Sequence, residues 1–75
     1  MRILTEYNGD GDFANRSALV VIDNNGDDHG VKYIMDNTVI DYRIFPEHSL
    51  YYAEDAAENW VKGIINPRDL LVNDY

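Results

Sequence analysis

Residues Ser49 to Ile64, SLYYAEDAAENWVKGI, decide the fold, because helical periodicity, a start signal and a stop signal coincide in this stretch. Its apolar residues follow steps typical of an α-helix with about 3.6 residues per turn: Leu50, Ala53, Ala57, Trp60, Val61 and Ile64. Ser49 is suited to cap the first turn with its hydroxyl, and Gly63 followed by Asn66-Pro67 is suited to end the helix. We therefore expect an amphipathic helix whose apolar stripe covers another layer.

The residues before this helix predict short strands. Arg2 to Tyr7 has the composition of a strand, and Ser17 to Ile22 is a nearly continuous apolar run, typical of a central strand buried on both faces for part of its length. The segments Asn8 to Arg16 and Asp23 to Gly30 are rich in Gly, Asp and Asn, which indicates loops. Phe13 is a candidate for an apolar anchor within the first loop.

The segment from Val31 to Phe45 predicts a β-hairpin with Asp36-Asn37 as a two-residue turn. The expected cross-strand pairs are Met35 with Thr38, Tyr33 with Ile40, Val31 with Tyr42, Ile34 with Val39 and Lys32 with Asp41. The last of these pairs joins opposite charges, which favours this register over one slipped by a residue. Pro46 is expected to end the second strand, because proline cannot donate to a ladder.

These elements predict a single α+β domain over residues 1–75, with about four antiparallel strands and one helix packed on one face. The sheet residues expected to face the helix are Val20, Ile22, Val31, Tyr33, Ile40, Tyr42 and Ile44. The C-terminal segment 66–75 fits either a short helical turn through Leu70 to Val72 or a small edge strand. A core of this size contributes only about 3–5 kcal/mol, which makes self-association into a homodimer a reasonable expectation.

The chain is strongly acidic, with 14 acidic and six basic residues and a formal net charge of −8. Nucleic acids and anionic membranes would repel such a surface, so the expected partner is a basic protein, or one that is neutral and indifferent to charge. The alternative is a structural or oligomerisation module, a homodimer, whose acidity serves only solubility. The absence of cysteine excludes disulfides and thiolate metal sites, and no apolar run approaches the roughly 20 residues that span a bilayer, so we expect a cytoplasmic protein.

Two loops imitate calcium-binding loops but depart from the EF-hand pattern. In the first, Phe13 and Leu19 occupy the positions where glycine and glutamate are needed, and in the second Asp28 replaces the glycine. His29, next to acidic residues, is more typical of a solvated side chain than of a metal ligand. We therefore expect neither a metal nor a cofactor.

The sequence also offers little for catalysis. His48 and Ser49 are adjacent, but neighbours in sequence point in different directions, and capping already accounts for the serine. No phosphate-binding loop or dinucleotide fingerprint is present. Trp60 belongs to the apolar stripe and is expected in the core. These features predict a non-enzymatic protein.

The remaining candidate site is a partner-binding surface. On the helix it comprises residues opposite the apolar stripe, namely Tyr51, Glu54, Asp55 and Glu58. A second acidic group comes from the loops and includes Asp23, Asp27 and Asp28, together with Asp10 and Asp12 of the earlier loop. Tyrosine is enriched in interfaces, and carboxylates complement basic partners. If both groups lie on one side, they present spaced negative charge similar to a phosphate backbone; otherwise they form a solvated helix face and polar loops.

In size, acidity, lack of cysteine and sheet-plus-helix pattern, the chain resembles small phage-encoded inhibitors such as anti-CRISPR and host-takeover proteins. The resemblance covers general features of the whole chain and assigns no residue a role. It implies an inhibitor that acts in the host cytoplasm and occupies a basic groove on a nucleic-acid-handling protein, without binding nucleic acid itself.

Overall fold

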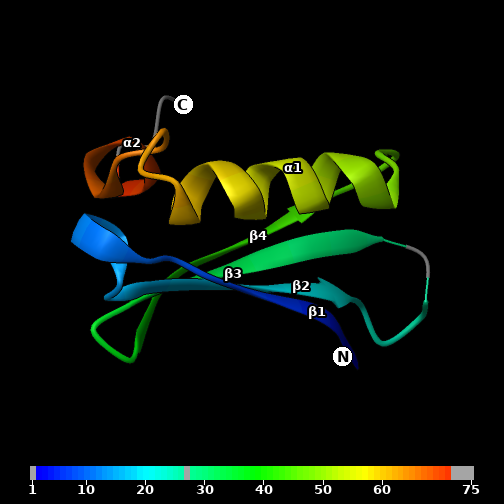
Figure 1. The fold of residues 1–75 in the computed structure, drawn as a ribbon. Helices are drawn as coiled ribbons and strands as arrows, with labels where there is room; N and C mark the ends of the chain where they lie inside the picture. Colours follow the sequence, from blue (N-terminus) through cyan, green and yellow to red (C-terminus); the bar gives the residue numbers. More distant parts are fainter. Residues whose placement is uncertain (1, 27, 72–75) are drawn as a thin grey trace.

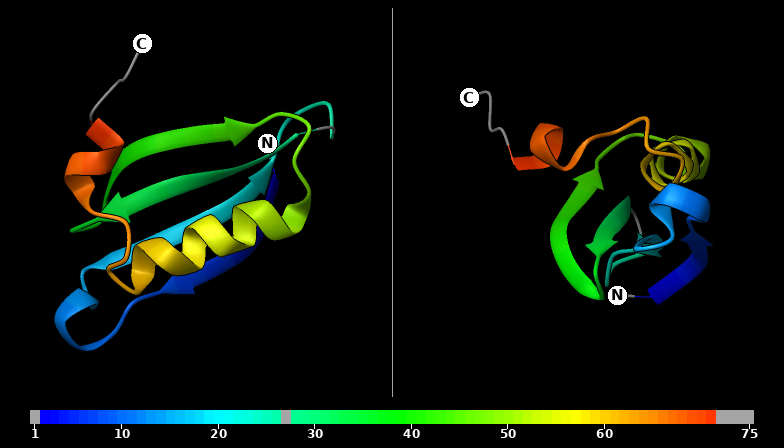
Figure 2. Two further views of the ribbon diagram at one scale, coloured as in Figure 1. Left: turned by 90° about the horizontal axis from the view of Figure 1, so that it is seen from above. Right: turned by 60° about the vertical axis from the view of Figure 1, so that its left-hand side comes forward.

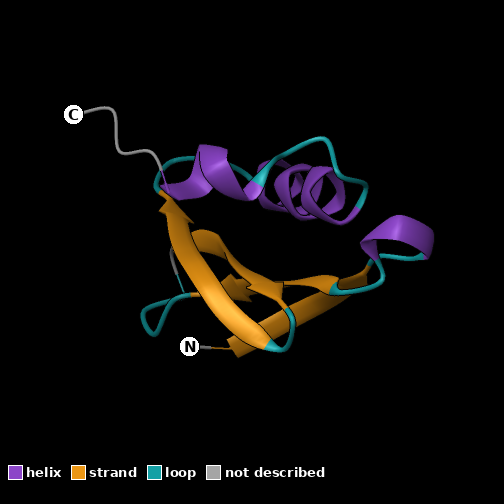
Figure 3. Ribbon diagram, turned by 90° about the vertical axis from the view of Figure 1, so that its left-hand side faces the viewer, coloured by secondary structure: helices purple, strands orange, loops and turns teal. Residues whose placement is uncertain are grey.

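The computed structural model describes residues 2–26 and 28–71, which form a four-stranded antiparallel sheet in the order β1-β2-β3-β4 with helices on one face (Figure 1). The elements are β1 Arg2–Asn8, the 3-10 helix η1 Gly11–Phe13, β2 Arg16–Ile22, β3 His29–Met35, β4 Thr38–Phe45, α1 Leu50–Val61 and α2 Pro67–Leu71. The sheet curls around the helical layer (Figures 2 and 3). The predicted α+β class and strand directions are confirmed.

The strand β2 is central, as its composition predicts. It pairs with β1 on one side and with β3 on the other. The consecutive residues Val20 and Val21 are both fully buried although their side chains point to opposite faces of the sheet. This observation confirms that part of β2 is covered on both faces.

The helix α1 packs on β2 and β3 through Ala53, Ala57 and Trp60, which are fully buried. Small alanines let the helix approach the sheet closely, and the indole of Trp60 fills the space beyond them. Its Nε1 atom donates to the main-chain carbonyls of Ser17 at 2.9 Å and Ile34 at 3.2 Å. The expectation that Trp60 belongs to the core is confirmed.

The C-terminal end of α1 is closed by a glycine cap. Gly63 has a φ of +82°, the Gly63 amide donates to the Trp60 carbonyl, and the Ile64 amide donates to the Asn59 carbonyl. These two bonds form a Schellman motif, which satisfies the last free carbonyls of the helix. The helix therefore stops at Val61, and the prediction that Ile64 continues the apolar stripe is wrong, since its side chain is 65% exposed.

Arg16 is a buried cation that ties the start of β2 to this end of α1. One guanidinium nitrogen donates to the carbonyls of Trp60 at 3.1 Å and Ile65 at 2.8 Å. The guanidinium also lies over the rings of Phe13, at 4.8 Å, and Trp60, at 4.3 Å from the ring centroids. The Phe13 ring in turn leaves no room for a Cβ on Gly63. Phe13 is thus the anchor that the first loop was expected to contain.

The N-terminal end of α1 is simpler than expected. Ser49 occupies the N-cap position with extended backbone angles, but its side chain makes no capping hydrogen bond. The prediction that the Ser49 hydroxyl satisfies the first-turn amides is therefore wrong. The predicted start of the helix at Ser49 is nevertheless correct, since Ser49 has the extended backbone angles of an N-cap residue.

The hairpin turn at Asp36 and Asn37 is confirmed. Both residues have positive φ, 54° and 65°, as a two-residue turn of this type requires. The pairs Met35–Thr38 and Ile34–Val39 also form as expected. Beyond them, an irregularity at Ile40 shifts the register, which is the behaviour of a β-bulge.

This bulge overturns the other three predicted pairs. Val31 lies opposite Arg43, Tyr33 opposite Asp41 and Lys32 opposite Tyr42. Asp41 instead forms an ion pair with Arg43, two residues along the same strand, at 2.7 Å. The charge pattern that favoured the regular register is satisfied within β4.

The bulge also changes which side chains face α1. Ile40 and Phe45 pack against the core, whereas Tyr42 and Ile44 point to the opposite face of the sheet. The expectation that Tyr42 and Ile44 face the helix is therefore wrong. Ile22 is half-buried and lies outside the core cluster, while Val20, Val31, Tyr33 and Ile40 pack as expected.

The C-terminal segment forms the helix α2, so the helical alternative for its start is the correct one. Pro67 occupies the first helical position, and the Asp69 carboxylate accepts a hydrogen bond from the Asn66 amide at 3.3 Å. Leu70 is buried in the core. Residues 72–75 lie outside the described residues. Within the described ranges, no helix combines the length and apolar character needed to cross a membrane.

Candidate protein-binding surface

The outer face of α1 carries the four residues expected there, Tyr51, Glu54, Asp55 and Glu58. Tyr51 is 78% exposed, Asp55 and Glu58 are exposed, and Glu54 is half-buried. They alternate with the buried alanines because residues three and four apart share a face of a helix. The structure therefore brings these residues together on one rigid element, and we call them the α1 outer face.

Two carboxylates of the α1 outer face, Glu54 and Glu58, lie near the phenol of Tyr7 on β1. Burial, followed by the negative charges of Glu54 and Glu58, raises the pKa of Tyr7 above its ordinary value. The protonated phenol of Tyr7, which is the form present at neutral pH, can act as a hydrogen-bond donor. The side of α1 that faces β1 thus combines two acceptors with one donor.

Lys62 reduces the charge at the end of this face. Its ammonium lies 3.3 Å from a Glu58 carboxylate oxygen, one helical turn away, and the two form an i,i+4 ion pair. Both side chains are largely exposed, so the pair contributes little to stability. Glu54 and Asp55 carry the charge that remains uncompensated within the helix.

A groove of about 380 Å³ lies between the β1–β2 connection and α1. It is lined by Tyr7, Asn8, Gly9, Asp10, Phe13, Glu58, Val61 and Lys62. Carboxylates from Asp10 and Glu58 stand at a wall that also includes the apolar side chains of Phe13 and Val61. Such a lining suits the aliphatic stem and charged end of a lysine or arginine side chain. Sequence analysis missed this groove because its two sides are distant along the chain.

The N-terminal end of α1 carries an aromatic cluster that sequence analysis also missed. The Tyr52 ring stacks on His48 with centroids 4.0 Å apart and meets Phe45 edge-on at 4.9 Å. The spacing of His48 and Tyr52, four residues apart across the helix start, was the available signal. The cluster extends the exposed surface next to Tyr51.

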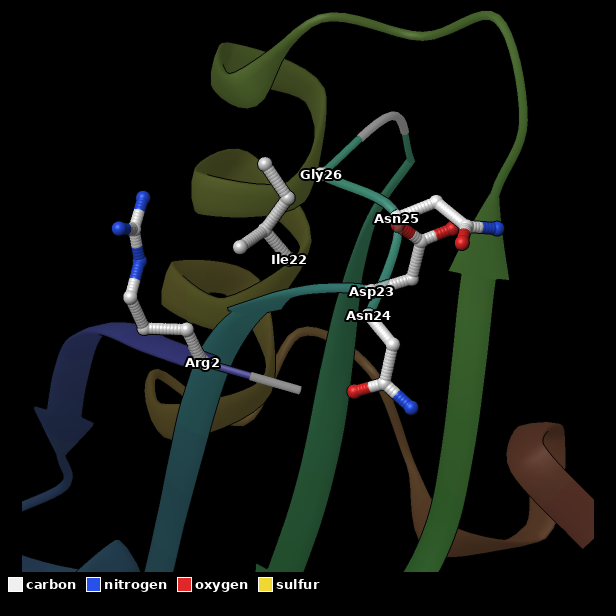
Figure 4. Close-up of a pocket in the computed structure, with 6 residues that line it drawn as sticks. All are labelled: Arg2, Ile22, Asp23, Asn24, Asn25 and Gly26. Carbon is white, nitrogen blue, oxygen red and sulfur yellow. The ribbon is translucent and has the colours of Figure 1, made fainter.

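The other predicted acidic residues lie in the β2–β3 connection. The Asp23 amide donates to the Asp28 carbonyl at 3.0 Å, and the Gly26 amide donates to the Asp23 carbonyl at 3.0 Å, which closes the loop. Arg2 and Ile22 border a hollow of about 290 Å³ beside it (Figure 4). The Asp23 carboxylate is turned towards Asn25 and away from Arg2 (Figure 4). Asp27 lies outside the described residues.

The two acidic loops do not form one cluster. The β2–β3 connection lies beside the N-terminal end of α1, whereas η1 and its neighbours lie at the opposite end of the sheet (Figures 1 and 2). The second acidic group is therefore divided between the two ends of the sheet, and the acidic segments form a series along the molecule: one loop, then the α1 outer face, then the other loop. In residues 2–26 and 28–71, no three or more His, Asp or Glu side chains gather as a metal site would require.

Comparison of the chain with protein-family models, with curated proteins and with solved structures found no match. What this surface can bind is therefore indicated by its own geometry. That geometry offers carboxylates and tyrosines on a rigid helix, together with an acidic groove beside it.

Proposed function

We propose that this protein is a non-enzymatic binding protein whose α1 outer face occupies a basic site on a partner protein. The observation that carries the proposal is the placement of Tyr51, Glu54, Asp55 and Glu58 on one helix whose opposite side is fixed in the core. A rigid carboxylate array loses little conformational entropy on binding and complements lysine and arginine side chains.

The kind of partner follows from charge. A net charge of −8 attracts cationic surfaces over several ångströms and repels phosphates. Basic grooves that normally hold a nucleic-acid backbone meet this description, so the proposed role is inhibition of a nucleic-acid-handling protein by competition for its groove. This role is the one implied by the resemblance to phage-encoded inhibitors, and it places the protein in the host cytoplasm.

The test compares two double variants with equal net charge. Asp55→Lys with Glu58→Lys reverses charge on the α1 outer face, and Glu6→Lys with Asp69→Lys reverses two exposed carboxylates outside the candidate surface. Each protein is immobilised and exposed to lysate of the source organism, and captured proteins are identified. Capture is carried out at about 0.1 M and at about 1 M salt, two concentrations at which the Debye length differs by roughly threefold.

Wild type and the Glu6/Asp69 variant should retain the same basic protein at low salt and release it at high salt, while the Asp55/Glu58 variant should not retain it. Circular dichroism checks that all three chains are folded. Equal retention by both variants would show that no particular face is used and that the acidity serves solubility alone.

A further inference from the structure

The strand β4 forms one margin of the sheet, with β3 as its only neighbour in the strand order (Figure 2). The main-chain groups on its outer side have no adjacent strand in the described chain. The amide of Tyr42 donates instead to the Asp41 carboxylate at 2.9 Å. A side chain therefore occupies a hydrogen-bonding position that another strand could take.

The sequence of β4 is symmetric about Tyr42. Asp41 and Arg43 flank it with opposite charges, and apolar pairs lie outside them, Val39-Ile40 on one side and Ile44-Phe45 on the other. When such a strand pairs antiparallel with a copy of itself about Tyr42, Asp41 of each chain lies opposite Arg43 of the other. This complementarity covers the regular part of the strand from Asp41 onward, because the bulge turns Ile40 to the core face, away from the face of Ile44.

We propose that β4 pairs antiparallel with β4 of a second copy about a two-fold axis at Tyr42, which joins two four-stranded sheets into one continuous sheet. The chain as a whole repels a second copy, but β4 carries one acid and one base and is neutral. Its side chains also offer apolar area, since Val39 is 50% and Tyr42 is 40% exposed. Charge and apolar exposure thus favour a second copy over a basic partner at this margin.

The other margin, β1, is less suited to the same pairing. Its register shifts between Ile3 and Thr5, at the third residue of the strand, and a bulge there twists the edge away from a partner. The irregularity in β4 also lies at the third residue, Ile40, but the five residues from Asp41 to Phe45, which include the proposed axis, keep a regular register.

Pairing exchanges bonds within the chain for bonds between chains. Arg43 bonds to Asp41 of its own strand and, at 2.7 Å, to the Leu70 carbonyl. Asp41 must release the Tyr42 amide before that amide can donate across the two-fold axis. A single added strand pair also gives a small interface, so the dimer should be a weak and reversible one.

Charge swapping at Asp41 and Arg43 tests the proposal. Dimerisation is measured by sedimentation equilibrium up to about 1 mM, a range that covers weak interfaces. Asp41→Arg and Arg43→Asp each place like charges opposite one another twice and should weaken the dimer by about tenfold or more. The double variant Asp41→Arg/Arg43→Asp restores opposite charges and should dimerise within about threefold of wild type.

Thermal unfolding of each variant measures how much stability is lost when the Asp41–Arg43 ion pair within β4 is removed. Sedimentation measures the loss of the Asp41–Arg43 pairs between two chains, so the two effects can be separated. A wild-type chain that stays monomeric throughout the range would overturn the proposal. Failure of the folded double variant to regain dimerisation would do so as well.

A cross-linking experiment tests the position of the axis. The chain has no cysteine, so Tyr42→Cys introduces a single thiol. Hydrogen-bonded residues in antiparallel strands have Cα atoms about 5.5 Å apart, which suits a disulfide. Under mild oxidation Tyr42→Cys should form covalent dimers about tenfold faster than Tyr51→Cys, the control thiol on α1, given the short separation across the axis.

Equal cross-linking rates for the two thiols would contradict pairing at Tyr42. The Asp55/Glu58 variant leaves β4 intact and lowers the net negative charge, so it should dimerise at least as strongly as wild type. Failure of partner capture and failure of dimerisation are therefore separate results.

Discussion

The two ends of α1 differ in how they are held. At the C-terminal end, Gly63 closes a Schellman motif, Arg16 donates to two carbonyls and Phe13 packs on the glycine. At the N-terminal end, Ser49 makes no side-chain cap, and Tyr51 is exposed. The described hydrogen bonds to the helix end are thus concentrated at the C-terminal end, while Tyr51 at the N-terminal end remains exposed.

The largest effect is expected from Arg16→Met, which keeps an unbranched stem but removes the donors to the Trp60 and Ile65 carbonyls. Buried carbonyls without donors and the lost ring contacts should lower the free energy of unfolding by about 3 kcal/mol. Urea denaturation measures this loss. Arg16→Lys keeps the charge but not the planar guanidinium group. Its free energy of unfolding should therefore lie between those of wild type and Arg16→Met. A loss under about 1 kcal/mol for Arg16→Met would mean that the Arg16 hydrogen bonds do not hold the C-terminal end of α1.

The next largest loss of stability is expected at Gly63. A comparison with Gly26 separates the cost of the backbone conformation from the cost of contact with a ring. Gly63→Ala and Gly26→Ala both place a Cβ on a residue with positive φ, +82° and +76°. Only Gly63 is also covered by the Phe13 ring, whereas a Cβ on Gly26 meets open space. Gly26→Ala should cost about 1 kcal/mol in stability and Gly63→Ala about 2 kcal/mol or more. Equal losses of unfolding free energy for the two variants in urea titrations would show that the Phe13 ring moves aside without cost.

A pH effect is expected from Tyr33, whose ring meets Trp60 edge-on at 5.6 Å beneath the same end of the helix. Burial, opposed by the positive charge of Arg43, raises the pKa of Tyr33 from 10.0 to about 12. Because the folded state keeps the proton more tightly than the unfolded state, this contribution is complete below pH 10 and is lost as pH rises towards 12.

Melting temperatures measured between pH 9 and pH 12 should therefore fall more steeply for wild type than for Tyr33→Phe, in the interval between the unfolded value of 10.0 and the folded value of about 12. Tyr51→Phe, at the exposed end of α1, is the control and should follow wild type. Parallel curves for wild type and Tyr33→Phe would contradict a buried, protonated phenol.

The smallest effect is expected at Ser49, at the opposite end. Ser49→Ala should change the free energy of unfolding by less than about 0.5 kcal/mol, below the value of about 1 kcal/mol typical of a lost cap, because no side-chain bond exists to remove. Thermal and urea unfolding both measure it. A loss of about 1 kcal/mol would reveal a capping bond in solution and reduce the contrast between the two ends.

The sequence predicted the local features of the molecule closely. The Ser49 start and the stop near Gly63 are encoded by neighbouring residues, and so is the turn at Asp36 and Asn37. The predicted hairpin register is wrong beyond Ile40 because the strand has a bulge there, which lets an edge strand follow a curled sheet. No residue pattern within the strand indicates this bulge.

The candidate site divides in the same way. The α1 outer face could be predicted because helical periodicity alone sorts Tyr51, Glu54, Asp55 and Glu58 from the buried stripe. The groove beside it could not, since Asp10 and Glu58 come together only when the β1–β2 connection lies against α1. The position of Asp23 and Asp28 at the other end of α1 likewise depends on the strand order.

By itself, the sequence determined the four strands and the helix α1, the acidic charge and the outward face of α1, because these depend on residues within a few positions of one another. Only the tertiary structure decided the role of Arg16, whose two acceptors are 44 and 49 residues away, and the face to which Tyr42 and Ile44 point. Long-range contacts and strand register are settled by packing around Trp60 and by the curl of the sheet, and neither leaves a local pattern in the chain.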